Sequence, residues 1–318
     1  MKKKLKASAV QMESAPGDKE SNFRVMEELV KDAAGEGVEL VVFPECCVSG
    51  YWFIRNLKPE ALDALSEPIP GPSTERLRRL AVQFRMTLGA GWVERGESGQ
   101  YHNSYVVALP DGRWFRHRKI HAFEHPLIRG GSELTVFDLP GGFRAGVLIC
   151  YDCNLIENVR MTALRGAEVL LAPHQTGAVR SRNPHLMGMI DRQLWDQRRE
   201  NPEAIEREFR SDKGRGWLMR WLPSRAHDNG LFLIFSNGVG VDDDEIRTGN
   251  AMILDPYGRV LSETWKASDE RVTADLDGSL LDEATGRIWI QARRPELYHP
   301  LTVPLGIEKE TRALKFQE

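Results

Sequence analysis

The feature that most constrains the fold is a short apolar run, residues 147–149, that leads directly into Cys150. An unbroken apolar run of this length is typical of a strand covered on both faces. A segment with the apolar spacing of a short helix follows at 158–165, and a second apolar run follows at 169–172. This order places Cys150 at the end of a strand, where open α/β sheets carry their sites. Taken alone, however, a free cysteine is more often a small buried hydrophobic residue.

The rest of the chain alternates apolar runs with a few amphipathic segments. Helices are predicted at 21–34 and 73–84, with Ser73 as the N-cap of the second. Further strands are predicted at 5–11, 38–43, 87–93, 104–109, 113–119, 231–236, 250–254, 260–265 and 272–277. Because hairpins are mixed with strands that helices separate, the pattern predicts an α/β fold in one domain. We expect a four-layer α-β-β-α sandwich, with two mixed sheets face to face and helices outside.

Residues 1–285 carry this pattern and form the predicted domain. Within it, residues 180–216 are polar and densely charged, and we interpret them as an inserted helical segment. The sequence leaves open whether this insertion is a solvated lobe or a lid. Residues 286–318 form a C-terminal tail without core patterning of its own, so we expect the tail to pack at the interface of a homodimer or a higher homo-oligomer.

Composition narrows the class of protein. The 318 residues carry a net charge of −3, which gives no indication of a nucleic acid or an anionic membrane as a partner. No apolar run approaches the length of a membrane span, and the basic N-terminus lacks the apolar core of a signal peptide. We expect the four cysteines to be reduced and the protein to be cytoplasmic.

Cys150 and Cys153 are separated by two residues, which is the spacing of some redox and zinc-binding motifs. The sequence lacks the second half of a zinc site and a thioredoxin-like context. We therefore expect no metal and no cofactor, and keep a redox protein built on these two cysteines as an alternative.

Three polar residues follow predicted strands: Glu45, Lys119 and Cys150. A carboxylate can take the proton of a thiol, and an ammonium can stabilise an oxyanion. Together with a nucleophilic cysteine, these groups predict acyl transfer through a thioester.

At these positions the sequence resembles the nitrilase superfamily of carbon–nitrogen hydrolases. The resemblance rests on three motifs in the family's order, and it extends over nearly the whole chain: Phe43-Pro44-Glu45, Arg118-Lys119-Ile120-His121 and Leu148-Ile149-Cys150-Tyr151-Asp152. The family implies a second catalytic glutamate between the lysine and the cysteine. Glu124 fits that register, whereas Glu133 is a competing candidate that falls after the glycine closing the loop.

The resemblance implies hydrolysis of a non-peptide C–N bond in a small amide, with release of ammonia or an amine. Glu45 would act as general base on Cys150, whose thiol pKa we expect Lys119 and a helix start to lower. Lys119 and the backbone N–H of Tyr151 would hold the oxyanion, and Glu124 would position Lys119 or share the acid work with Glu45. The intact set argues against a non-catalytic interaction protein.

The substrate is less constrained. Tyr151 and Asp152 resemble the amidase-type branches, so N-carbamoyl amidohydrolase or nitrilase activity is the alternative. No arginine closely follows Cys150 to pair with a substrate carboxylate, although Arg180 or Arg182 of the insertion could do so. We therefore expect an uncharged or aromatic-bearing amide. The candidate substrate-binding residues are Tyr151, Trp52, His174 and Gln175.

Overall fold

The central strand of the fold is β1 (Lys4–Met12). In this computed structural model, which describes residues 3–181 and 183–316, β1 pairs in parallel with β2 (Leu40–Val42) and antiparallel with β13 (Glu270–Asp277). Its last two residues, Gln11 and Met12, also pair with β9 (Phe232–Asp242). One strand therefore joins two sheets.

The first sheet continues from β1 and β2 to three further strands, β3 (Thr87–Arg95), β4 (Tyr101–Ala108) and β5 (Trp114–Arg118). The second sheet extends from β9 to β8 (Val169–His174), β7 (Arg144–Val147) and β6 (Val136–Asp138). Three more strands complete it: β10 (Glu245–Thr248), β11 (Met252–Leu254) and β12 (Val260–Glu263). Parallel and antiparallel pairs occur in both sheets.

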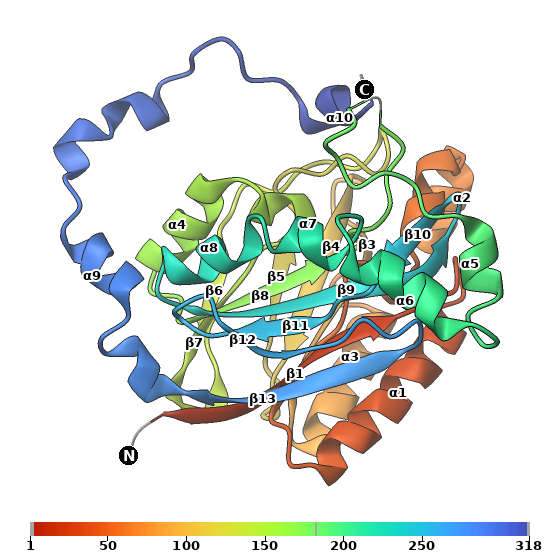
Figure 1. Ribbon diagram of the computed structural model, residues 1–318, viewed down its shortest axis with the longest axis horizontal. Coiled ribbons are helices and arrows are strands. Elements are labelled where there is room, and N and C mark those ends of the chain that lie inside the picture. Colours follow the sequence, from red (N-terminus) through yellow and green to blue (C-terminus); the bar gives the residue numbers. More distant parts are fainter. Residues whose placement is uncertain (1–2, 182, 317–318) are drawn as a thin grey trace.

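Three apolar clusters define the layers. The central cluster joins inward-facing residues of the first sheet, such as Val42 and Val107, to residues of the second, such as Leu171 and Ile234. A second cluster packs α1 (Lys19–Gly35) and α3 (Pro72–Phe84) on the outer face of the first sheet. A third packs α4 (Ile156–Leu164) and α8 (Leu222–His227) on the outer face of the second (Figure 1). The order of layers is α-β-β-α, which confirms the predicted sandwich.

The start of α3 differs from the prediction. Gly71 is its N-cap and Pro72 is its first residue, a position that suits the fixed φ of proline. The Ser73 hydroxyl donates a hydrogen bond of 2.7 Å to Glu67, and the Ser73 N–H donates to the same carboxylate. The prediction of Ser73 as N-cap was therefore wrong, because an adjacent proline and a buried carboxylate take precedence.

The charged segment 180–216 contains α5 (Arg192–Asp196), α6 (Pro202–Arg210) and the start of α7 (Arg215–Leu218). Most of its charged residues are exposed or half-buried, although Glu206 is buried, and Trp195, Ile205 and Phe209 pack with residues of β9 and β10. The insertion is thus anchored to the second sheet.

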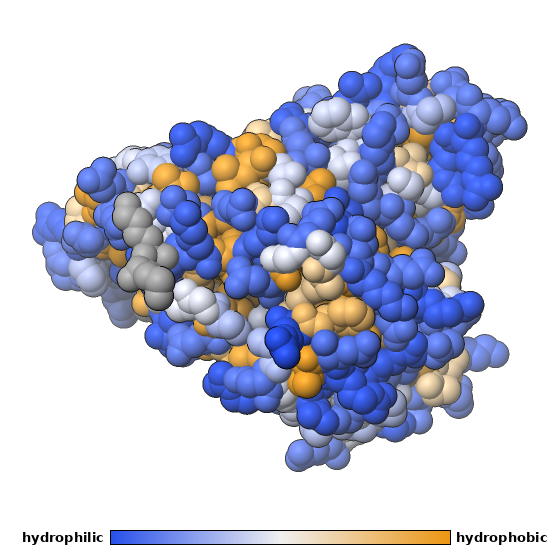
Figure 2. All heavy atoms as spheres, turned by 90° about the horizontal axis from the view of Figure 1, so that it is seen from below, coloured by the Kyte–Doolittle hydropathy of each residue, from blue (hydrophilic) through white to orange (hydrophobic). Residues whose placement is uncertain are grey.

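The shorter elements are α2 (Pro59–Leu65), η1 (Trp52–Asn56), η2 (Pro140–Gly142), η3 (Cys150–Cys153) and η4 (Gly278–Leu281). After α9 (Thr285–Gln291), the described part of the chain, up to residue 316, carries η5 (Pro295–Leu297), η6 (His299–Thr302) and α10 (Thr311–Lys315). This tail arcs away from the body and returns to it at α10 (Figure 1). The face in Figure 2 is mainly hydrophilic, with hydrophobic patches between the polar groups. Among the described residues, no helix is long and apolar enough to span a membrane.

Candidate active site

The structure brings Glu45, Lys119 and Glu124 into one buried cluster. Glu45 follows β2, Lys119 follows β5, and Glu124 lies on the loop after Lys119. The Lys119 Nζ lies 2.7 Å from Glu45 Oε1 and also donates a hydrogen bond to Glu124 Oε1. All three side chains are fully buried. One ammonium therefore faces two carboxylates away from solvent.

Burial and charge perturb the proton affinities of this cluster. Burial raises the pKa of Glu45 to about 7, and Glu124 adds to the shift while Lys119 opposes it. Burial alone would lower the pKa of Lys119, but the carboxylates of Glu124 and Glu45 raise it well above its usual value. With Lys119 charged and both glutamates ionised, the cluster carries one excess negative charge. Glu45 is thus poised to accept a proton near neutral pH.

Asn103 supports both carboxylates, although the sequence did not single it out. Its side-chain amide donates a hydrogen bond of 2.7 Å to Glu45 Oε1 and one of 3.0 Å to Glu124 Oε1. The Phe123 N–H donates to Glu124 Oε2 at 3.0 Å. The other Glu45 oxygen, Oε2, is buried and has no hydrogen-bond partner among the described residues. That oxygen is available for proton transfer.

Cys150 starts the 3₁₀ helix η3, and its φ of +51° is unusual for a residue with a side chain. The preceding strand, β7, already ends at Val147, so the predicted strand at 147–149 was displaced toward the C-terminus. Leu148 and Ile149 are buried in the connection to η3. A strained turn of this kind exposes a nucleophile above a sheet edge.

The Cys150 thiol does not have the lowered pKa that we expected. Burial raises its pKa to about 12, Glu45 contributes to the rise, and Lys119 opposes it. The Lys119 ammonium does not lower the pKa of the thiol because burial, followed by the charge of Glu45, outweighs it. The thiol is therefore protonated at rest.

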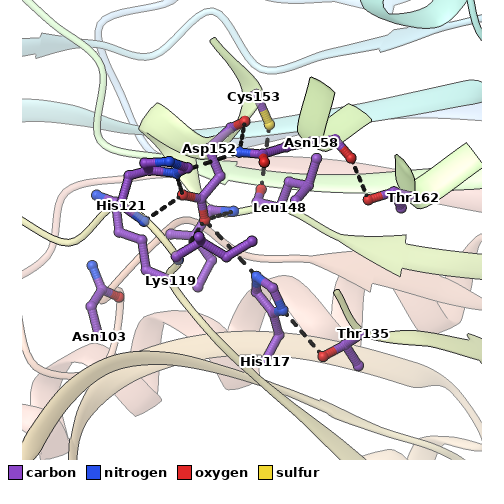
Figure 3. Close-up of polar contacts among 12 residues, drawn as sticks. Asn103, His117, Lys119, His121, Thr135, Leu148, Asp152, Cys153, Asn158 and Thr162 are labelled. Atoms are coloured by element: carbon purple, nitrogen blue, oxygen red, sulfur yellow. Dashed lines mark hydrogen bonds and ion pairs between the residues drawn. The ribbon is translucent and has the colours of Figure 1, made fainter. Parts of the chain in front are cut away.

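Asp152 links the cysteine turn to the segment that carries Lys119 (Figure 3). Its carboxylate accepts hydrogen bonds from the backbone N–H of Ile120 at 3.0 Å and of His121 at 2.8 Å, and from His121 Nδ1 at 2.9 Å. His117 Nε2 lies 3.9 Å from the same carboxylate. Burial alone would raise the pKa of Asp152, but the two histidines hold it well below its usual range. An ionised carboxylate thus fixes the turn at Cys150 to the segment that follows Lys119.

A cavity of about 290 Å³ opens onto Cys150. Of the predicted substrate-binding residues, Tyr151, Trp52 and Gln175 line it. The Gln175 side chain also donates 2.8 Å to the backbone oxygen of Glu45. His174 is not among the lining residues. It is buried beside Phe235, and burial lowers its pKa to about 3.

The cavity has further walls that the motifs did not indicate. Phe123, Trp217 and Trp221 add aromatic side chains to it, and Leu186 and Met187 of the insertion also line it. Arg180 is not among the lining residues, and Arg182 lies outside the described residues.

A buried arginine contributes to the cavity wall, but it comes from β10. Arg247 is held by Asp242, at 2.9 Å from its Nε, and by Glu245, at 2.9 Å from its Nη1. Its positive charge is thus already matched by neighbouring carboxylates. Burial raises the pKa of Glu245, which also lines the cavity.

Comparison with known proteins supports the family resemblance seen in the sequence motifs. The chain matches the carbon–nitrogen hydrolase family over residues 6–201 and 206–285. It is 34% identical to the omega-amidase NIT2-B of Xenopus laevis, over 93% of this chain and 97% of that protein. It is 29% identical to an (R)-stereoselective amidase of a Pseudomonas species, over 86% of this chain and 85% of that protein.

Solved structures share the fold. A carbon–nitrogen hydrolase from Helicobacter pylori G27 superposes with a TM-score of 0.75 at 22% identity, covering 95% of this chain and 99% of that chain. The amidase from Nesterenkonia sp. AN1 in complex with butyramide gives a TM-score of 0.67 at 20% identity, covering 93% and 96%. The chain therefore belongs to the carbon–nitrogen hydrolases of the nitrilase superfamily, in their amidase-like branch.

Proposed function

We propose that the protein hydrolyses small amides with Cys150 as nucleophile, Glu45 as general base and acid, Lys119 as oxyanion stabiliser and Glu124 as the residue that positions Lys119. The observation that carries this proposal is the buried cluster of Glu45, Lys119 and Glu124 beside a cysteine in a strained turn.

The proposed reaction begins with transfer of the Cys150 proton to Glu45 as the sulfur attacks the carbonyl carbon. The resulting tetrahedral oxyanion lies against the Lys119 ammonium, and the backbone N–H of Tyr151, at the start of η3, can supply a second donor. Collapse breaks the C–N bond, and Glu45 returns the proton to the departing nitrogen. Water then attacks the thioester, again with Glu45 as base, and releases the acid and the free thiol.

The charge state of the cluster supports this assignment of roles. A carboxylate with a pKa of about 7 accepts a proton reversibly, so Glu45 can serve as base in one step and as acid in the next. Lys119, with its pKa raised well above the usual value, keeps its charge through the cycle.

For the acyl group, we infer an uncharged or aromatic-bearing amide. Several aromatic side chains line the cavity, and the arginine that reaches it is already paired with two carboxylates. The amidase from Nesterenkonia sp. AN1 has been solved in complex with butyramide, which is an uncharged amide.

A second candidate is an amide that carries a remote carboxylate. The presence of Arg247 in the cavity wall favours it, and the omega-amidase name of the Xenopus protein is compatible with it. A panel of neutral amides, carboxylate-bearing amides, N-carbamoyl amino acids and nitriles, compared by kcat/KM, decides between the candidates. A tenfold preference for an anionic compound, about 1.4 kcal/mol in the barrier, would reject the neutral class.

The roles are tested separately from the substrate. Lys119→Gln and Glu45→Gln are each expected to lower kcat at least about a hundredfold, because oxyanion and proton-transfer groups contribute that much in comparable enzymes. Ammonia release is the assay. Near wild-type kcat in either variant would remove that residue from the mechanism.

The exposed tail and the cysteines support two further parts of the proposal. Apolar side chains such as Leu301, Leu305 and Ile307 are at least 70% exposed, as expected of a segment that packs against another subunit. The four cysteines are free and buried, which suits a reducing cytoplasm. We infer a cytoplasmic homo-oligomer.

A further inference from the structure

The C-terminal helix α10 is attached to the segments that carry the catalytic residues. From residue 291 to residue 310 the chain is exposed except at two half-buried positions, and it then returns to the body (Figure 1). The Phe316 ring stacks on Trp52, with centroids 6.1 Å apart and an interplanar angle of 9°. Arg312 Nη1 donates a hydrogen bond of 2.7 Å to the backbone oxygen of Phe123, the residue directly before Glu124. After an exposed stretch of chain, α10 and Phe316 are therefore held beside the site by these contacts.

This attachment makes α10 part of the cavity. Leu314 and Lys315 line it together with Trp52 and Phe123. The Lys315 ammonium lies 5.8 Å from the centre of the Phe123 ring, on the cavity side of the helix. The last described residues of the chain thus form a wall of a site whose nucleophile is Cys150.

Lys315 also completes the charge balance at one corner of the cavity. Asp242 and Glu245 supply two negative charges there, and Arg247 supplies one positive charge. The charge of Lys315 acts on Glu245 and favours its ionised form. With Lys315 in place the four groups sum to zero, and without it the corner keeps one negative charge.

We propose that α10 is a specificity-determining wall of the substrate cavity and that Lys315 sets its charge preference, so that the distal corner takes an uncharged acyl group. The proposal rests on amide hydrolysis at Cys150 and adds the residues that select the acyl end. Removal of the Lys315 charge should convert the corner into one that prefers an ammonium-bearing acyl group.

The charge test uses Lys315→Met, which keeps the apolar stem, and Lys309→Met as the matched control in the exposed tail. Three primary amides of equal chain length would carry a neutral, an ammonium or a carboxylate end. We expect Lys315→Met to raise kcat/KM for the ammonium compound about five- to tenfold relative to the neutral one, and to lower it for the carboxylate compound. Lys309→Met should leave these ratios unchanged. Equal ratios in wild type and Lys315→Met would overturn the charge assignment.

The wall itself is tested with Phe316→Ala, which removes the ring that stacks on Trp52, and with Leu305→Ala as a control at a 70% exposed position. We expect Phe316→Ala to raise KM at least threefold for amides with long acyl groups, and Leu305→Ala to leave it at the wild-type value. Unchanged KM for the long amides would overturn the role of α10 as a wall.

A readout without turnover separates this proposal from the proposed function. Iodoacetamide alkylation of Cys150, followed by mass spectrometry, should be faster in Phe316→Ala than in Leu305→Ala or wild type. If wild type hydrolyses no amide but the alkylation rates differ in this way, the proposed function fails and the placement of α10 stands. If amides are hydrolysed but neither KM nor alkylation responds, α10 is not part of the site.

Discussion

Replacing Asp152 with asparagine should impair catalysis through the backbone of the lysine segment, without touching a reacting group. The substitution preserves the shape of the side chain but removes its charge. The carboxylate of Asp152 now accepts hydrogen bonds of 3.0 Å or less from Ile120 and His121. In the variant, the new amide NH₂ group is itself a donor and would face one of these N–H groups. The segment that begins with Lys119 should therefore shift relative to Cys150.

The stability cost can be worked from these contacts. Hydrogen bonds to a charged group contribute about 1.5–3 kcal/mol each, and the amide retains one acceptor oxygen. The loss of two such contacts, partly compensated by the remaining oxygen, gives a decrease of about 2–4 kcal/mol in the free energy of unfolding. Because the native pKa of Asp152 is depressed, this contribution is present above the unfolded pKa of about 3.9 and is lost as pH falls through the native pKa. The difference between variant and wild type should thus shrink in acid.

The catalytic cost has a different origin. Lys119 itself is held by backbone hydrogen bonds to Asn103 and Gly131, each 2.8 Å, so Asp152 governs only the continuation of the segment. A displacement of a fraction of an ångström is then expected, and it should lower kcat about 10- to 100-fold with little change in KM.

The assay combines urea unfolding with steady-state ammonia release at a temperature where each variant is folded. Asp255→Asn is the matched control: Asp255 is a fully buried carboxylate that accepts from the Tyr257 N–H at 2.9 Å and the Arg259 N–H at 3.0 Å, in the turn between β11 and β12. Both variants should lose stability, but only Asp152→Asn should lose kcat. Equal kcat in the two folded variants would refute the positioning role.

Four further outcomes are expected. Cys150→Ala should abolish ammonia release with unchanged circular dichroism, and turnover near the wild-type rate would remove the nucleophile. Glu124→Gln should lower kcat strongly and Glu133→Gln only slightly, since Glu124 is buried and paired with Lys119 whereas Glu133 is exposed; the reverse order of kcat values would reassign the second glutamate. Wild-type kcat/KM should fall as pH drops through about 7, and Asn103→Leu should move this limb to higher pH, because it removes a donor that favours the ionised base. Light scattering should give a mass above that of a 36.0 kDa monomer, and a monomer at micromolar concentration would contradict oligomerisation.

The sequence was most informative about candidate site residues that directly follow a strand. Glu45, Lys119 and Cys150 follow β2, β5 and β7, and the topology brings such ends together, so their meeting could be predicted without coordinates. The layer order followed from the mixture of hairpins and helix-separated strands, and it is confirmed.

The sequence was least informative about groups whose role depends on distant partners. Asn103 lies in β4 among other polar residues, so its pattern did not mark it as the shared donor of two carboxylates. The cavity walls from Leu186 and Leu314 depend on where an insertion and a tail come to rest, which local periodicity does not encode. The prediction that the pKa of the Cys150 thiol is lowered was wrong, because the burial of the thiol and the charges around it are set only once the site is assembled.

The pairing of β1 with β13 also bears on how the chain reaches its native state. Lys4 lies opposite Asp277, so the central strand has its antiparallel neighbour at the far end of the domain sequence. A pairing with this sequence separation carries a large loop-closure cost and raises the contact order, which slows folding. During synthesis, β1 must wait with one edge unpaired until residues beyond 277 have left the ribosome. Until β13 pairs, the partly folded chain exposes a strand edge, and such edges make folding intermediates prone to aggregate.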